Sequence, residues 1–282
     1  MFVIVRFAII ISALLFTDRR LNAQGYAPDT VVVQSGNLRL KGLLWKPDGT
    51  GSFPAIIFCH GSLGGIDTIH DPLREASLLG NVFANRGYIF FALFRRGAGL
   101  SKNEGVNSTD LMDNAFKEKG QEERNKVQLQ QLETDQLKDM ISGMKFLKSQ
   151  RNTDTNHVAI IGHSFGGSLA LLLAEHERNV KAVVVFSPAG YSWNLSPPLR
   201  ERLLTAIKNI AMPVMIIHAQ NDYSVNPGFT LDSMMNQLHK THVLKIYPKF
   251  GNSASEGHGL IFQGTKIWEA DVFKFLDEYM KY

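Results

Sequence analysis

The chain has 282 residues, of which 44% are hydrophobic and 20% are charged, so it has enough apolar material for one large domain or two small ones. Its net charge of +4 is too small to indicate a nucleic-acid-binding protein, and no basic run with interleaved aromatic residues occurs. The single cysteine, Cys59, excludes an internal disulfide framework and a cysteine-based zinc site. No apolar run after residue 16 is long enough to span a bilayer, which excludes a polytopic membrane protein.

The N-terminal residues are typical of a secretory signal peptide. Arg6 precedes the apolar stretch Phe7–Phe16, and Ala23 is a small residue at a suitable place for cleavage. We therefore expect residues 1–23 to be removed and the mature chain to be periplasmic or extracellular, without stable membrane insertion. The alternative is an uncleaved membrane anchor, although the apolar stretch is short for a bilayer.

The rest of the chain is expected to form a single α/β domain, residues 24–282. Two strands flank the turn residues Gly36 and Asn37 and indicate an antiparallel hairpin. After this hairpin, apolar strands alternate with amphipathic helices, which is typical of a doubly wound, mostly parallel sheet with helices on both faces. The expected strands are Thr30–Val33, Leu38–Trp45, Ala55–Cys59, Tyr88–Leu93, Val158–Ile161, Ala182–Phe186, Val214–Ile217 and Val243–Tyr247. The expected helices are Pro72–Arg86, Asp135–Lys148, Ser168–His176, Leu199–Ile210, Phe229–Leu238 and Ile267–Tyr282.

Two segments interrupt this alternation. Residues 97–133 are a long polar connection, which we expect to be a mobile flap over a pocket rather than part of the core. The second, Ser187–Arg200, carries Tyr191 and Trp193, which we take as candidate substrate contacts.

The strongest chemical signal is the sequence Gly162-His163-Ser164-Phe165-Gly166, a G-x-S-x-G motif between an apolar strand and a helix. In this context the serine occupies a strained turn, and the two glycines let the strand and the helix approach each other. The N-terminus of the helix favours negative charge that develops near the serine. We therefore expect Ser164 to be a nucleophile.

A serine nucleophile needs a general base and an acid that orients the base. Asp222 and His258 each follow a predicted strand, and open α/β sheets place functional groups beyond the carboxyl ends of their strands. We expect Asp222 to be the acid and His258 the base. Glu256 and Asp67 are the alternative acids.

The loop after the first predicted parallel strand contains His60, Gly61 and Ser62. Such a loop can direct a backbone N–H at an oxyanion, so we expect Ser62 and Phe165 to supply the two backbone donors of an oxyanion hole. A nucleotide-binding glycine loop is the alternative, but the segment contains no G-K-S/T sequence.

These motifs occur in the order seen in the α/β-hydrolase superfamily, and the chain most resembles the dienelactone hydrolase family, with similarity to the catalytic domains of prolyl oligopeptidases. The resemblance covers roughly Leu40 to Tyr282 and implies an α/β-hydrolase fold and the same roles for Ser164, Asp222, His258, Ser62 and Phe165. Many dienelactone hydrolases carry cysteine at the nucleophile position, where this chain has serine.

Arg95 and Arg96 follow a predicted strand at the same edge of the sheet. Arg96 is a candidate for binding a substrate carboxylate. A structural ion pair or a solvated turn is the alternative, and we favour it.

The motifs together predict an exported serine hydrolase that cleaves small carboxylic esters through an acyl-enzyme, with no cofactor and no metal. The partner is a small-molecule ester, not a nucleic acid, and the sequence indicates no particular oligomeric state. The alternatives are a serine peptidase of the oligopeptidase kind and a non-catalytic binding protein that retains the fold.

Overall fold

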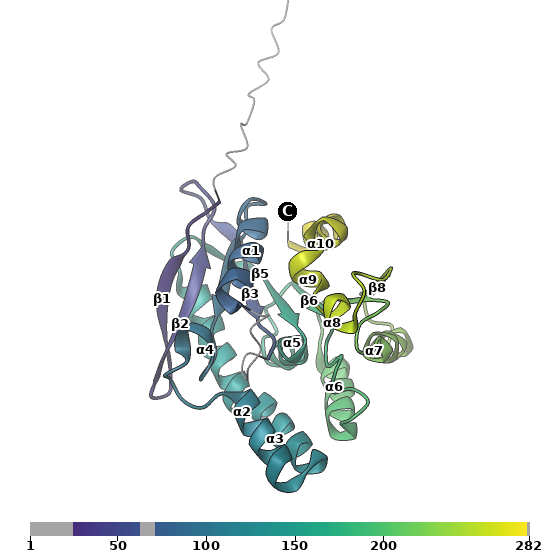
Figure 1. Ribbon diagram of the computed structural model, residues 1–282. Coiled ribbons are helices and arrows are strands. Elements are labelled where there is room, and N and C mark those ends of the chain that lie inside the picture. The colour runs from purple at the N-terminus through teal and green to yellow at the C-terminus, as the bar shows by residue number, and fades with distance from the viewer. Residues whose placement is uncertain (1–24, 63–70, 281–282) are drawn as a thin grey trace, which may run out of the picture.

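The computed structural model of the chain describes residues 25–62 and 71–280, which form an eight-stranded sheet between two layers of helices (Figure 1). The strand order is β1-β2-β4-β3-β5-β6-β7-β8. β2 pairs antiparallel with the edge strand β1 on one side and with β4 on the other, and all the other pairs are parallel. The strands are β1 (Asp29–Ser35), β2 (Leu38–Trp45), β3 (Phe53–Cys59), β4 (Ile89–Leu93), β5 (Thr153–His163), β6 (Ala182–Phe186), β7 (Val214–Ala219) and β8 (His242–Tyr247). The expected hairpin followed by a parallel sheet is confirmed.

Apolar side chains cover both faces of the sheet, because its inner strands have no solvent-facing side. On one face lie α2 (Ser108–Lys119), α3 (Gln121–Glu133), α4 (Asp135–Ser149), α5 (Phe165–His176), α6 (Pro197–Asn209) and α7 (Asn226–Gln237). On the other face lie α1 (Pro72–Ala84), α9 (Leu260–Gln263) and α10 (Thr265–Met280). A short helix, α8 (Ala254–His258), follows β8.

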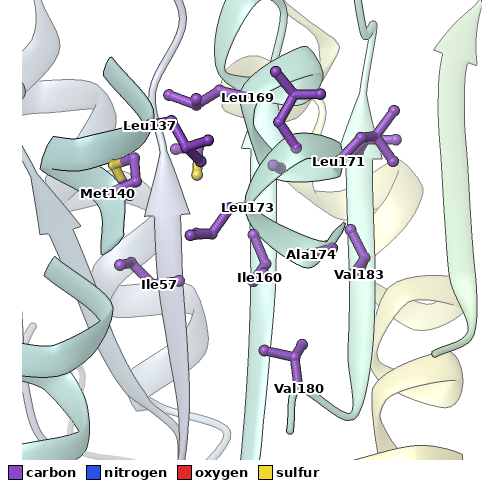
Figure 2. Close-up of a cluster of buried hydrophobic side chains, with 14 of the residues drawn as sticks. Ile57, Leu137, Met140, Ile160, Leu169, Leu171, Leu173, Ala174, Val180 and Val183 are labelled. Atoms are coloured by element: carbon purple, nitrogen blue, oxygen red, sulfur yellow. The ribbon is translucent and has the colours of Figure 1, made fainter. Parts of the chain in front are cut away.

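The helix α5 packs along the middle of the sheet (Figure 2). Its leucines lie over apolar residues of the central strands, and α4 supplies Leu137 and Met140 to the same cluster. Leu169, Leu171 and Leu173 are all fully buried. Burial of a leucine side chain contributes about 1.5–3 kcal/mol, so this packing fixes the position of the N-terminus of α5, where Ser164 lies.

The expectation that residues 97–133 lie outside the core is wrong, although the segment does line a pocket as expected and its mobility stays a prediction. The segment forms the short turn of helix η1 (Gly99–Ser101) and then the two helices α2 and α3, which lie side by side and pack near α6 (Figure 1). Met112 of α2 and Leu132 of α3 are buried in the hydrophobic core. The pair is therefore part of the folded domain. We call α2 and α3 together the helical hairpin.

If the helical hairpin belongs to the core, Leu132→Ala should lower the free energy of unfolding by about 2–5 kcal/mol, because it removes a fully buried side chain and leaves a cavity. Phe116→Ala is the matched control, since Phe116 lies in the same hairpin and is 51% exposed; it should cost less than about 1 kcal/mol. Urea denaturation of both variants measures the difference. Small and equal losses of unfolding free energy in the two variants would show that the helical hairpin does not belong to the core.

The structure contains no helix within residues 25–62 and 71–280 that is long and apolar enough to cross a membrane. The expected signal peptide, residues 1–23, lies outside the described residues.

Candidate active site

Ser164 lies in the sharp turn that joins β5 to α5, and its φ of 56° is in the left-handed region, which non-glycine residues rarely adopt. Close backbone packing explains the two glycines of the motif. A Cβ on Gly166 would lie 2.0 Å from the carbonyl oxygen of Cys59, and one on Gly162 would lie 2.3 Å from the carbonyl oxygen of Gly166. The turn therefore holds the serine hydroxyl away from β5 and α5, at the carboxyl ends of the parallel strands.

The structure brings Ser164, His258 and Asp222 together from three separate segments of the chain. The Ser164 hydroxyl donates to His258 Nε2 at 2.8 Å, and His258 Nδ1 donates to Asp222 Oδ1 at 2.7 Å. His258 is the last residue of α8, and Asp222 follows β7. This geometry lets His258 take a proton from Ser164 while Asp222 holds the imidazole in the required tautomer.

Asp222 has a second histidine partner. His218 Nδ1 donates to Asp222 Oδ2 at 2.7 Å, and the backbone N–H of Tyr223 donates to Oδ1 at 2.7 Å. Burial by itself raises the pKa of Asp222, but the hydrogen bonds from His218 and His258 outweigh it and hold the pKa well below the ordinary value. The Asp222 side chain is fully buried and stays ionised.

Two further residues fix the loop that carries His258. His163 Nε2 donates to the backbone carbonyl of His258 at 2.9 Å, and its ring lies 4.8 Å from the His258 ring, measured between centroids. The Asn221 amide donates to the carbonyl oxygens of Phe250 and Ser253 and accepts from the N–H of Phe250. These bonds tie the loop to the end of β7 and to the serine turn.

The two expected oxyanion donors flank Ser164. Phe165 is the first residue of α5, and Ser62 lines the same pocket from the loop after β3. A Cβ on Gly61 would lie 3.5 Å from Ser164 Cβ, so this loop passes directly beside the serine.

The Arg95 side chain is hydrogen-bonded to this loop. Its guanidinium is buried and donates to the carbonyl oxygens of His60 at 2.9 Å and Gly61 at 3.2 Å, and its Cζ lies 5.5 Å from the centroid of the Phe165 ring. His60 Nε2 accepts from the Arg95 backbone N–H. Burial, together with the charge of Arg95, lowers the pKa of His60 well below its ordinary value, so His60 is neutral. Arg95 therefore contacts both segments that carry the expected oxyanion donors.

Arg95→Met should lower the free energy of unfolding by about 2–4 kcal/mol, because it removes the buried donor to the His60 and Gly61 carbonyl oxygens and to Gln136 Oε1. It should also lower kcat more than it raises KM, since the loop loses the support that positions Ser62. Arg95→Lys should recover part of the unfolding free energy and part of kcat, because an ammonium group still donates to a carbonyl. Steady-state kinetics and urea denaturation test this, and an unchanged kcat in Arg95→Met would contradict the positioning role.

The pocket at Ser164 has a volume of about 240 Å³ and an opening to solvent. Tyr191, expected as a substrate contact, lines it, and the ring of Tyr191 packs edge-on against Tyr223. The remaining walls come from α1, the helical hairpin, the loop after β6 and α9; they include Glu75, Thr109, Met112, Arg124, Gln128, Ala189, Ser192 and Phe262.

The structure does not bring the other two expected substrate contacts to this pocket. Trp193 is buried in the hydrophobic core, with 3% of its surface exposed. The Arg96 guanidinium is held by Asp135 at 2.5 Å and Asp139 at 2.7 Å, which is the structural ion pair favoured from the sequence. Of the alternative acids, Glu256 accepts bonds from Asn252 and Ser253 in its own turn, and Asp67 lies outside the described residues.

With this geometry established, comparison with known proteins gives the family. The sequence profile of the dienelactone hydrolase family matches residues 40–259, more than three quarters of the chain. The chain belongs to the dienelactone hydrolase family. It is therefore a hydrolase, and the presence of serine rather than cysteine at position 164 makes it a serine member of that family.

Solved structures show the same fold. A putative dienelactone hydrolase from Klebsiella pneumoniae has a TM-score of 0.63 at 16% identity, with 92% of this chain and all of that chain covered. An acylaminoacyl peptidase from Pyrococcus horikoshii has a TM-score of 0.66 at 18% identity, with 92% of this chain but only 43% of that chain covered. The chain thus spans less than half the length of the solved peptidase it matches.

One curated relative has a comparable length. The protein described as uncharacterized peptidase YtmA, from Bacillus subtilis, is 22% identical over 255 residues, which is 78% of this chain and 84% of that protein. The α/β-hydrolase fold predicted from the sequence is thereby confirmed for this member of the dienelactone hydrolase family.

Sequence reasoning missed the supporting residues of the site. His218 lies in β7, one position beyond the expected strand Val214–Ile217, and its contact with Asp222 depends on the turn after β7. Their i, i+4 spacing is the one signal that could have suggested this contact. Arg124 and Gln128 were missed because the segment that carries them was expected to be a flap.

Proposed function

We propose that this protein is an exported serine hydrolase that cleaves small carboxylic esters through an acyl-enzyme intermediate. The observation that carries the proposal is the continuous chain of hydrogen bonds from Ser164 through His258 to Asp222, at 2.8 and 2.7 Å, which opens on a pocket. A binding protein without chemistry has no need for this alignment.

In the proposed reaction, Ser164 Oγ attacks the ester carbonyl while His258 Nε2 takes the hydroxyl proton. The oxyanion that forms accepts hydrogen bonds from the backbone N–H groups of Ser62 and Phe165. His258 then gives its proton to the departing alcohol, which leaves an acyl group on Ser164. Water, deprotonated by His258, attacks this acyl group, and the carboxylic acid departs as Ser164 recovers its proton. Asp222 stays ionised throughout and stabilises the imidazolium form of His258.

The size of the pocket supports a small substrate. Its volume of about 240 Å³ is below the range of about 300–1,000 Å³ of pockets that bind drug-sized ligands. An amide also demands more of a site than an activated ester, because the amine leaving group needs a well-placed proton. The peptidase alternative rests on the names of the Bacillus subtilis relative and of the acylaminoacyl peptidase structure.

The test compares esters with amides on one purified protein. We expect 4-nitrophenyl acetate and butyrate to be hydrolysed with a far higher kcat/KM than the 4-nitroanilides of alanine and proline, at a pH of about 8, where an unperturbed imidazole is neutral. Anilide hydrolysis that equals or exceeds ester hydrolysis would replace the esterase proposal with the peptidase.

Export is proposed from the sequence of residues 1–23 alone. Expression of the full chain, followed by mass determination of the protein recovered outside the cytoplasm, measures it. A mass that corresponds to the loss of about 23 residues supports cleavage, and an intact chain in the membrane fraction would support the anchor instead.

A further inference from the structure

Two exposed tyrosines line the pocket beside the catalytic histidine. Tyr223 packs against the His258 ring, with 5.0 Å between the ring centroids, and Tyr191 packs edge-on against Tyr223 at 5.7 Å. Tyr191 is 57% exposed and Tyr223 is 45% exposed, so both keep ring surface free for a ligand. In the proposed reaction His258 gives its proton to the departing alcohol. The alcohol part of the substrate therefore lies next to these two rings, which we call the aromatic pair.

A second wall of the same pocket contains polar atoms without partners. Thr109 of α2 and Arg124 and Gln128 of α3 line the pocket, and we call them the polar wall. In each of them one buried side-chain atom has no hydrogen-bond partner in the described part of the chain: Thr109 Oγ1, Arg124 Nη1 and Gln128 Oε1. Buried polar groups are nearly always bonded. Three such atoms on one wall therefore indicate a ligand that supplies the missing partners.

The unpartnered atoms of the polar wall include both donors and an acceptor. Arg124 Nη1 only donates, Gln128 Oε1 only accepts, and the Thr109 hydroxyl does both. The Gln128 amide is held in this orientation because its Nε2 donates to Ser192 Oγ at 2.9 Å. An anion offers acceptors alone and leaves Gln128 Oε1 unpartnered, and one amide group offers two partners for three atoms. Neighbouring hydroxyl groups can satisfy all three atoms, since each hydroxyl donates and accepts.

The polar wall and the aromatic pair meet at Ser192. This residue is bonded to Gln128 and directly follows Tyr191 in the chain. The pocket thus offers aromatic ring surface on one side and hydrogen-bonding groups on the adjoining side. A sugar ring has matching parts, because its C–H groups form apolar faces that pack on aromatic rings and its hydroxyl groups project around its edge.

We propose that the alcohol part of the substrate is a carbohydrate and that the protein releases a short acyl group, such as acetate, from a sugar hydroxyl. The proposal rests on the proposed function, because the sugar oxygen is the leaving group that His258 protonates, and water then releases the acid from Ser164. The pocket volume of about 240 Å³ is below that of pockets for drug-sized ligands, which favours one sugar ring with a short acyl group.

The experiment compares esters that match in shape and differ in hydroxyl groups. The 6-O-acetyl derivatives of methyl α-D-glucopyranoside, galactopyranoside and mannopyranoside are compared with cyclohexylmethyl acetate, since all four are acetates of a primary alcohol on a six-membered ring. N-acetylalanine methyl ester presents one amide group instead. Titration of the released acid gives kcat/KM. We expect the wild-type value to be at least about tenfold higher for one of the sugar esters than for cyclohexylmethyl acetate, as two or three neutral hydrogen bonds provide.

Thr109→Val should reduce this sugar-to-cyclohexylmethyl ratio about two- to tenfold. The variant should fold normally, because the hydroxyl that it removes has no partner in the described part of the chain. Thr153→Val is the matched control, since Thr153 Oγ1 is also buried and unpartnered but lies at the start of β5, at the opposite end of that strand from Ser164. It should leave the ratio unchanged.

Tyr191→Ser tests the aromatic pair. It should lower kcat/KM for the preferred sugar ester about tenfold, because the sugar ring loses the surface on which it packs. Phe229→Ser is its control, since Phe229 is 52% exposed on α7 but does not line this pocket. Equal values for Tyr191→Ser and Phe229→Ser would contradict the role of the aromatic pair.

Three results would overturn the carbohydrate proposal: a wild-type ratio near one for all three sugars, an equal ratio in wild type and Thr109→Val, or a loss in Thr109→Val confined to N-acetylalanine methyl ester, which would assign the polar wall to a peptide. Labelling with a fluorophosphonate separates these failures from failure of the proposed function. Labelled protein without a sugar preference remains a serine hydrolase. Absence of both labelling and ester hydrolysis in the folded wild-type protein would overturn the proposed function, and the carbohydrate proposal with it.

Discussion

Replacing Ser164 by alanine is expected to lower kcat for ester hydrolysis by roughly 10⁴- to 10⁶-fold and to abolish labelling by a fluorophosphonate. The variant loses the hydroxyl that His258 Nε2 accepts at 2.8 Å, and no other hydroxyl is bonded to that nitrogen in the described part of the chain. The fold should persist, because the backbone N–H of residue 164 still donates to the carbonyl oxygen of Phe186. Kinetics, probe labelling and a thermal melt measure the three quantities.

Ser168→Ala is the matched control for this change. Ser168 lies one turn further along α5, is buried, and has a hydroxyl with no hydrogen-bond partner. Its loss should leave activity and labelling close to those of the wild type. Substantial hydrolysis by Ser164→Ala would remove Ser164 as the nucleophile, and a wild-type protein that takes no label would favour a binding protein.

The strands and the serine turn could be predicted because local rules determine them. Apolar runs such as Val158–Ile161 have no exposed face in the sheet, and the close backbone approaches at Gly162 and Gly166 leave no room for a side chain. The order of Ser164, Asp222 and His258 along the chain followed from the same pattern of strands, since each residue lies in the connection that follows one of them.

The helical hairpin could not be predicted, because α2 is mostly polar and α3 does not show a clear apolar stripe. In α3, polar residues such as Asn125, Gln128 and Gln131 are buried, so the buried positions of this helix are not marked by apolar residues. Asn125 is buried because its amide donates to the carbonyl oxygen of Leu195, a contact across seventy positions of sequence. Arg124 and Arg95 could not be recognised for the same reason, because their contacts depend on segments that are distant in the sequence.

Replacing Asp222 by asparagine is expected to lower kcat by about 10³- to 10⁴-fold. Asp222 accepts from two imidazoles and one backbone N–H, and an asparagine has a single acceptor oxygen for these three donors. The asparagine amide would also donate to His258 Nδ1, which favours the tautomer with the proton on Nε2. That tautomer cannot accept the proton of Ser164. Steady-state kinetics on a 4-nitrophenyl ester measure the loss.

The dependence of stability on pH supplies a second readout of the same carboxylate. The pKa of Asp222 lies well below the ordinary value of 3.8 in the folded protein, so the unfolded chain binds this proton more readily. Asp222 therefore contributes stability that is fully present above pH 3.8 and is lost as the pH falls below it. The melting temperature of Asp222→Asn should decline less steeply over this acid range than that of the wild type.

Glu256→Gln is the control, because Glu256 was the other described candidate for the acid. Its carboxylate accepts from the backbone N–H groups of Asn252 and Ser253 and from the Ser253 hydroxyl, and it caps α8 rather than contacting the His258 ring. Loss of a capping residue costs about 1 kcal/mol, so Glu256→Gln should lose some stability and keep most of its kcat. A collapse of kcat in Glu256→Gln together with near-normal turnover by Asp222→Asn would reverse the assignment. Comparable losses in both would instead show that the position of α8, rather than one carboxylate, limits the reaction.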